Sequence, residues 1–93
     1  MKSNPDKLLK KHRELIHSDM MKVTSHVQRR DKHSDWIINT IMVEGWDVPF
    51  RFKRKKEFRN VKGARVNLTY YRDVESIGGM EMEVMTVVRV KIS

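Results

Sequence analysis

The chain has 93 residues, no cysteine and a formal net charge of +8 at pH 7. This length fits one domain over residues 1–93, and the lack of cysteine excludes disulfides and thiolate metal sites. Apolar runs reach only three residues, as at 36–38, which excludes a membrane-spanning helix, and the lysine-rich start predicts no signal peptide. Because a cysteine-free chain suits a reducing compartment, we expect a cytoplasmic protein without a membrane partner.

The first segment is typical of a helix start. Asn4 can cap free amides, Pro5 suits the first helical position, and Asp6 opposes the positive end of the helix dipole. The residues that follow recur at helical spacing on one face: Leu8, Leu9, His12, Leu15 and Ile16. The pattern predicts a helix over residues 5–18.

The rest of the chain, residues 21–92, is expected to be rich in β structure. Residues 20–30 are compatible with a helix or a strand, and the alternation of β-prone residues favours a strand over 21–29. Alternation predicts four further strands, at 36–43, 48–54, 66–71 and 82–92. The expected fold class is therefore α+β. An N-terminal helix would precede a curled antiparallel sheet or small five-stranded barrel, of the size of SH3-like and OB-like domains.

Gly45 marks the tightest predicted turn. At the first central position of a two-residue type II′ hairpin, it would pair Ile41 with Phe50. The same register sets Trp36 opposite Lys55 on the other face. Residues 73–79 are expected to form a loop. The alternation of the strands predicts a buried core of Phe50, Phe52, Val66, Leu68, Val84 and Val88.

The strongest functional signal is a concentration of positive charge. Residues 51–65 hold eight Lys or Arg against one acid, Glu57. Such a segment attracts polyanions without regard to their sequence, and neighbouring aromatic rings could stack on bases. The candidate nucleic-acid contacts are Arg51, Lys53, Lys55, Lys56, Arg59, Lys62, Arg65 and Tyr71. The alternative interpretation is a solvated strand face whose cations oppose edge-to-edge pairing.

A second candidate surface is apolar. The strand predicted at 36–43 carries apolar residues on both faces, so both faces need cover. Trp36, Ile38 and Met42 would be covered either by the N-terminal helix or by a partner. In the second case they would form the interface of a protein-interaction module or a homodimer.

Nothing in the sequence indicates an enzyme. No two of the four histidines have the helical i, i+4 spacing of a metal pair. Gly78 and Gly79 precede a predicted strand, whereas a phosphate-binding loop precedes a helix. Glu81 and Glu83 are better explained as a surface ladder than as an acid/base pair. We therefore expect no catalytic residue, metal or cofactor, and a small basic module that binds RNA or single-stranded DNA weakly without reading sequence.

Overall fold

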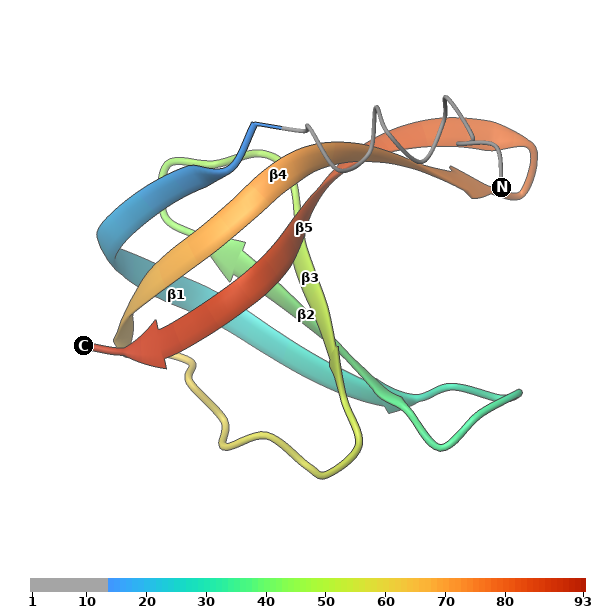
Figure 1. Cartoon of the computed structure of the whole chain (residues 1–93), viewed down its shortest axis with the longest axis horizontal. Helices are drawn as coiled ribbons and strands as arrows, with labels where there is room; N and C mark the ends of the chain where they lie inside the picture. The colour runs from blue at the N-terminus through green and yellow to red at the C-terminus, as the bar shows by residue number, and fades with distance from the viewer. Residues whose placement is uncertain (1–13) are drawn as a thin grey trace, which may run out of the picture.

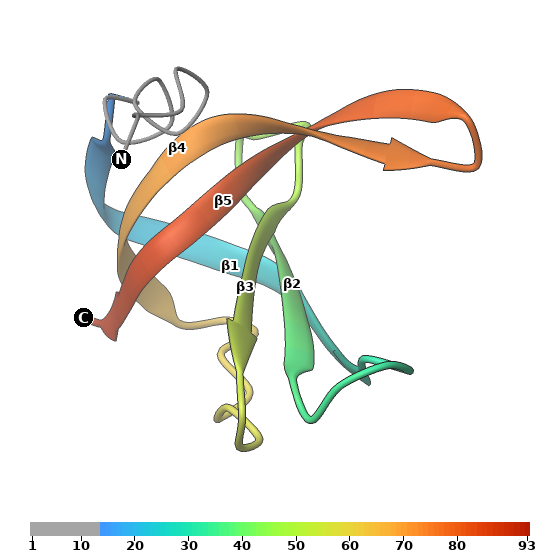
Figure 2. The ribbon, with the colours of Figure 1, turned by 45° about the vertical axis from the view of Figure 1, so that its right-hand side comes forward.

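The computed structural model describes residues 14–93, which form a closed β-barrel (Figure 1, Figure 2). The strands are β1 (Ile16–Arg30), β2 (Ile37–Val43), β3 (Phe50–Arg54), β4 (Arg65–Ile77) and β5 (Met80–Ile92). They follow the order β1-β2-β3-β5-β4 around the barrel, and β4 closes it by pairing with β1. The β3–β5 pair is parallel, and the other four pairs are antiparallel.

The expected α+β class is wrong, because residues 14–93 contain no helix. Ile16, placed in the predicted helix, already belongs to β1, where it lies opposite Tyr70 of β4 and packs against the core. Its neighbour Leu15 is 56% exposed, so the two side chains do not share one buried helical face. Their spacing fits the in-out alternation of a strand equally well. Residues 5–13 of the expected helix lie outside the described residues.

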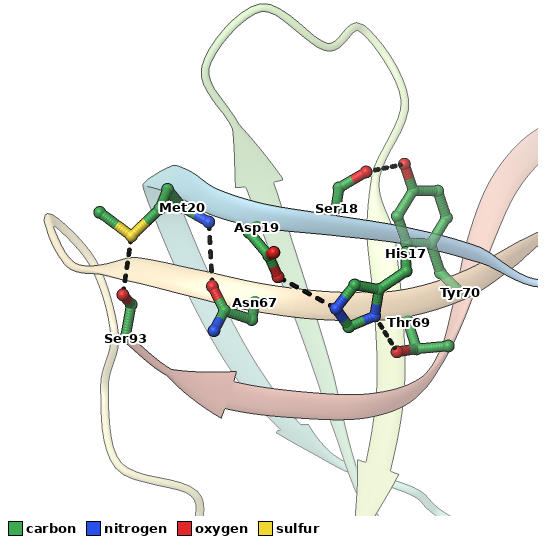
Figure 3. A network of polar contacts seen from close by, with 8 residues as sticks. All are labelled: His17, Ser18, Asp19, Met20, Asn67, Thr69, Tyr70 and Ser93. Carbon is green, nitrogen blue, oxygen red and sulfur yellow. Dashed lines mark hydrogen bonds and ion pairs between the residues drawn. The ribbon is translucent and has the colours of Figure 1, made fainter.

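One long strand, β1, serves two neighbours and closes the barrel. Its first part pairs with β4 and its second part with β2, so residues 20–30 are strand. The register shifts between Ser18 and Met21, where Met20 adopts a positive φ of 59°. The Met20 amide donates to Asn67 Oδ1 at 2.9 Å (Figure 3), and the Arg65 guanidinium donates to the Met20 carbonyl at 3.1 Å. These bonds hold the bulge at which the strand bends.

The predicted register of β2 and β3 is confirmed, since Ile41 lies opposite Phe50. The predicted type II′ turn is wrong. The Trp46 amide donates to the Val43 carbonyl at 3.0 Å, which places Gly45 at the second central position of the turn. Its φ of 86° is the value that a type II turn requires there, and a glycine adopts it without strain.

The core fills the barrel with side chains from all five strands. Five of the six predicted core residues are buried: Phe50, Phe52, Val66, Leu68 and Val84. Phe50 meets Tyr70 edge to face, with ring centroids 4.9 Å apart. The prediction for Val88 is wrong, because Val88 is 51% exposed. The β4–β5 register shifts at this point, which leaves Val88 as an extra residue and moves the inward positions of β5.

The connection from β3 to β4, residues 55–64, crosses one end of the barrel (Figure 1). Val61 inserts into the core, and the Phe58 ring lies 5.3 Å from the Phe52 ring. The Val61 amide donates to His26 Nδ1 at 3.0 Å, so His26 Nε2 carries the proton donated to Asn39 Oδ1 at 2.8 Å. This connection closes the barrel end with side chains and has no helix.

The β4–β5 hairpin projects beyond the barrel (Figure 2). Its strands stay paired from Tyr71 and Thr86 to Ile77 and Met80, so the loop predicted over 73–79 is wrong. Only Gly78 and Gly79 form the turn, both with positive φ. The hairpin thereby gives the barrel a projecting wall on one side.

Candidate nucleic-acid interface

The outer face of β2 and β3 contains residues of both candidate surfaces predicted from sequence, the cationic one and the apolar one. Because side chains alternate along a strand, Ile38, Thr40 and Met42 of β2 point outward, while Asn39 and Ile41 between them are buried. Arg51 and Lys53 point outward from β3, and Ile38 lies directly opposite Lys53. The structure therefore brings two of the expected cations and part of the expected apolar interface onto one face.

A groove of about 420 Å³ lies over this face. In Figure 2 the β1–β2 connection and the β4–β5 hairpin both project to the right, on either side of the β2–β3 face. The floor consists of Ile38, Thr40 and Arg51, and the walls consist of residues 29–33 on one side and Glu75 with Ile77 on the other. The groove is thus built from three parts of the chain that are distant in sequence: residues 29–40, Arg51 and residues 75–77.

Arg51 is held in place on the floor of the groove. Its Nε donates to Thr40 Oγ1 at 3.3 Å, and its Nη1 forms an ion pair with Glu75 from the β4–β5 hairpin. Both side chains are partly exposed, at 24% for Arg51 and 40% for Glu75. Water therefore screens the pair, and a phosphate that approaches Arg51 has to compete with Glu75.

The β1–β2 connection forms an ordered wall. Asp31 accepts hydrogen bonds from the His33 amide at 3.1 Å and from the Ser34 hydroxyl at 3.0 Å. These two bonds, the first being the larger cause, lower the pKa of the Asp31 carboxyl below its ordinary value of 3.8. The Asp31 amide also donates to the Trp36 carbonyl at 2.9 Å. The loop therefore presents the exposed Lys32 from a fixed backbone.

Three of the groove cations were missed in the sequence. Arg29, Arg30 and Lys32 are exposed and line the wall opposite Glu75. The candidate cations predicted from sequence all came from residues 51–65, where the positive charge is more concentrated. The run Arg29-Arg30-Asp31-Lys32 was the available signal. These cations become part of a candidate site only in the folded barrel, where they line the same groove as Arg51.

Most of the expected cations do not reach this groove. Lys56, Arg59 and Lys62 are exposed on the connection that crosses the barrel end, and none of them lines the groove. Arg65 begins β4 and is hydrogen-bonded to Met20, which assigns it to the bulge of β1. Lys55, directly after β3, places its Nζ 5.3 Å from the Trp36 ring centroid.

Tyr71 shares the outer face with Arg51 but lies two strands away. Thr86 of β5 is opposite Arg51 on one side and opposite Tyr71 on the other. Tyr71 lines a different hollow, together with Ile16 and Arg72. Tyr71, which was expected to act together with the cations of residues 51–65, is therefore separated from Arg51 by Thr86 and does not line the groove.

A polar network on β1 and β4 is the main alternative cluster (Figure 3). His17 lies 2.8 Å from Thr69 Oγ1 through Nδ1 and 3.0 Å from Asp19 Oδ1 through Nε2. Ser18 and Tyr70 hydroxyls are 3.0 Å apart. The network joins β1 to β4. Within residues 14–93 no group of three or more His, Asp or Glu side chains could hold a metal ion.

Comparisons with protein-family models, with curated proteins and with solved structures find no match for this chain. No helix in the part that the structure describes is long and apolar enough to cross a membrane.

Proposed function

We propose that the groove over β2 and β3 binds RNA or single-stranded DNA weakly and without reading its base sequence. One observation carries the proposal: four cations, Arg29, Arg30, Lys32 and Arg51, line an open groove whose floor also holds the apolar Ile38. Lys and Arg side chains neutralise backbone phosphates and release their counterions. Ile38 adds an apolar contact for an unpaired base on that floor.

The strand order supports the location. A five-stranded barrel in which β1 pairs with both β2 and β4, and β3 runs parallel to β5, has the Greek-key order of the OB fold. Barrels of that kind bind oligonucleotides or oligosaccharides over strands 2 and 3, between the loops that follow strands 1 and 4. The groove occupies the same place. Since one fold carries many functions, this analogy supports the position and not the ligand.

The charges in the groove also set the expected strength and selectivity. Asp31 and Glu75 line it beside the four cations, so the local field is only modestly positive. The chain's overall charge of +8 adds long-range attraction that does not depend on sequence. Phosphate contacts position a strand but carry no sequence information. Weak, salt-sensitive binding without sequence readout follows. We place this activity in the cytoplasm, which suits a cysteine-free chain.

A charge-matched pair of triple variants tests the proposal. Arg29, Arg30 and Lys32 are changed to Gln in the first variant, and Lys56, Arg59 and Lys62 in the second; all six side chains are exposed. Both variants lose the same net charge, but only the first alters the groove. Fluorescence anisotropy with a labelled oligo(dT) or oligo(U) should show a larger loss of affinity for the groove variant. Equal losses would reduce the effect to bulk charge, and no binding by the unmodified protein would refute the proposal.

Protein interaction is a second candidate function, favoured by apolar side chains that stay exposed. Trp36 is 39% exposed, and Ile38 and Met42 are half-buried on the outer face of β2. A homodimer through this face predicts a mass that rises with protein concentration in sedimentation experiments. A constant monomer mass together with salt-dependent oligonucleotide binding would favour the nucleic-acid proposal.

A further inference from the structure

We infer that Trp36 and Lys55 form a base-stacking position beside the groove, so that the preferred ligand is a strand with at least one unpaired base. This inference rests on the proposed function and deepens it. It names the residue that a base contacts and the class of nucleic acid that can make the contact. A duplex keeps its bases stacked on one another and cannot offer one without unstacking it.

The exposure of Trp36 is unusual for an aromatic ring in this protein. The other six Phe, Tyr and Trp side chains are buried or half-buried, whereas Trp36 is 39% exposed. Trp46, for comparison, packs edge to face against Phe50 and Tyr70, at centroid distances of 5.4 and 6.0 Å. Trp46 therefore belongs to the barrel core. Trp36 is the tryptophan that a base can reach.

The backbone of Trp36 is fixed before any ligand arrives. Its carbonyl accepts the Asp31 amide at 2.9 Å, and its amide donates to Ser34 Oγ at 3.2 Å. Trp36 directly precedes β2 and comes two residues before Ile38, which lies on the floor of the groove. Alternation along the strand therefore puts the two side chains on the same face. Residues two apart along a strand are separated by about 7 Å, the scale of one nucleotide step. A nucleic-acid strand bound in the groove can therefore reach the Trp36 ring.

Lys55 supplies the charge that accompanies the ring. Its Nζ lies 5.3 Å from the Trp36 ring centroid, within the range of a cation–π contact. Lys55 is exposed, and its side chain is flexible enough to leave the ring. A base can then stack on Trp36 while the ammonium binds the phosphate of the same nucleotide. Ring and cation together match what single-stranded nucleic acid requires.

The stacking ring expected from sequence was Tyr71, and the geometry favours Trp36 instead. Tyr71 is half-buried and belongs to a hollow that the groove cations do not line. Trp36 adjoins the wall that carries Lys32 and lies beside Lys55. The two aromatic candidates can be separated by experiment, because Tyr71→Ala and Trp36→Ala remove one ring each.

The test compares strands that differ only in their bases. The probes are an oligo(dT) of about ten nucleotides, within the usual site size of a small barrel, and an abasic strand of the same length and charge. In a Trp46→Phe protein the emission comes from Trp36 alone. We expect oligo(dT) to quench it and the abasic strand to bind without quenching. Trp36→Ala should weaken oligo(dT) binding roughly 5- to 150-fold, the range for loss of one stacked base, and leave abasic binding unchanged.

Controls separate stacking from charge and from misfolding. Trp36→Phe should restore most of the oligo(dT) affinity, because it restores a ring. Lys55→Gln should weaken oligo(dT) and abasic strand alike. Quenching is measured with Trp36 intact, so it decides the matter even if Trp36→Ala is unstable. If oligo(dT) binds in the groove without quenching and Trp36→Ala changes nothing, the stacking inference is overturned and the proposed function stands. If neither strand binds near physiological salt, both are overturned.

Discussion

Arg51 of β3 and Glu75 of the β4–β5 hairpin form an ion pair across the groove, although they are 24 residues apart in sequence. The pair connects the floor of the groove to its projecting wall. Arg51 is the one cation of the groove that was predicted from sequence as a phosphate contact, and in the structure it is already paired with Glu75. The groove therefore contains a carboxylate that any bound phosphate has to displace from Arg51.

Replacing Glu75 should strengthen binding. Glu75→Gln removes the competing carboxylate and leaves Arg51 free to contact phosphate, so we expect the affinity for a single strand to rise roughly two- to fivefold. Glu83→Gln is the matched control, because it makes the same charge change on an exposed side chain of the same hairpin outside the groove lining. Anisotropy titrations of the two variants at one salt concentration measure the difference. An equal gain in both would mean that Arg51 takes no part in binding.

The salt dependence of binding should report the number of phosphates contacted. For about five phosphates, the slope of log affinity against log salt is about −3.5 on a single strand. In the variant with Gln at positions 29, 30 and 32, the slope should become less negative by about 2, because each of the three lost phosphate contacts contributes about 0.7. A slope near zero in the unmodified protein would argue against a backbone contact of any kind.

The barrel core should depend strongly on Phe50. This side chain is fully buried against Tyr70 and Trp46. Phe50→Ala should cost roughly 3–5 kcal/mol out of a total stability on the order of 5–9 kcal/mol, so the variant should be largely unfolded in mild urea. Val88→Ala, at a position 51% exposed, is the control and should shift the free energy of unfolding by about 0.5 kcal/mol or less. A small effect at Phe50 with a large one at Val88 would contradict the β5 register.

The β1–β2 connection should loosen in acid. The pKa of Asp31 is lowered in the folded state, so its ionised carboxylate favours the ordered loop above the ordinary value of 3.8. That contribution is lost as the pH falls through the lowered pKa, when Asp31 no longer accepts both hydrogen bonds. A carbon NMR titration should place the Asp31 midpoint below 3.8. Ser34→Ala should move it back toward that value, and an unchanged midpoint would remove Ser34 as a cause.

The parts of the fold that depend on neighbouring residues could be predicted from sequence. The in-out alternation of β2 and β3 predicted the pairing of Ile41 with Phe50 correctly, although the turn between the strands differs from the predicted type II′ turn. The helix prediction failed at Leu15 and Ile16, where a few apolar residues satisfy both the helical and the strand period. The prediction that Val88 is buried failed because a bulge shifts the inward positions of β5, and no local sequence pattern marks that bulge.

The composition of the site depended on pairings between distant segments. Charge density at residues 51–65 is visible in the sequence, but only Arg51 among those cations lines the groove. Arg51 meets Glu75 only because β3 pairs with β5 and β5 carries β4 beside it. Arg29 lies on the same face because β1 pairs with β2, which pairs in turn with β3. These pairings depend on the whole fold, so composition predicted the kind of ligand and not the binding face.

Mapping backbone amide shifts during an oligo(dT) titration tests the central claim most directly. We expect saturable shifts that cluster at residues 29–33, Trp36, Ile38 and Arg51, because these residues surround the groove or border it. The far part of the β3–β4 connection, residues 56–64, should change little. Shifts confined to that connection, or spread evenly over the barrel, would contradict a binding site in the groove.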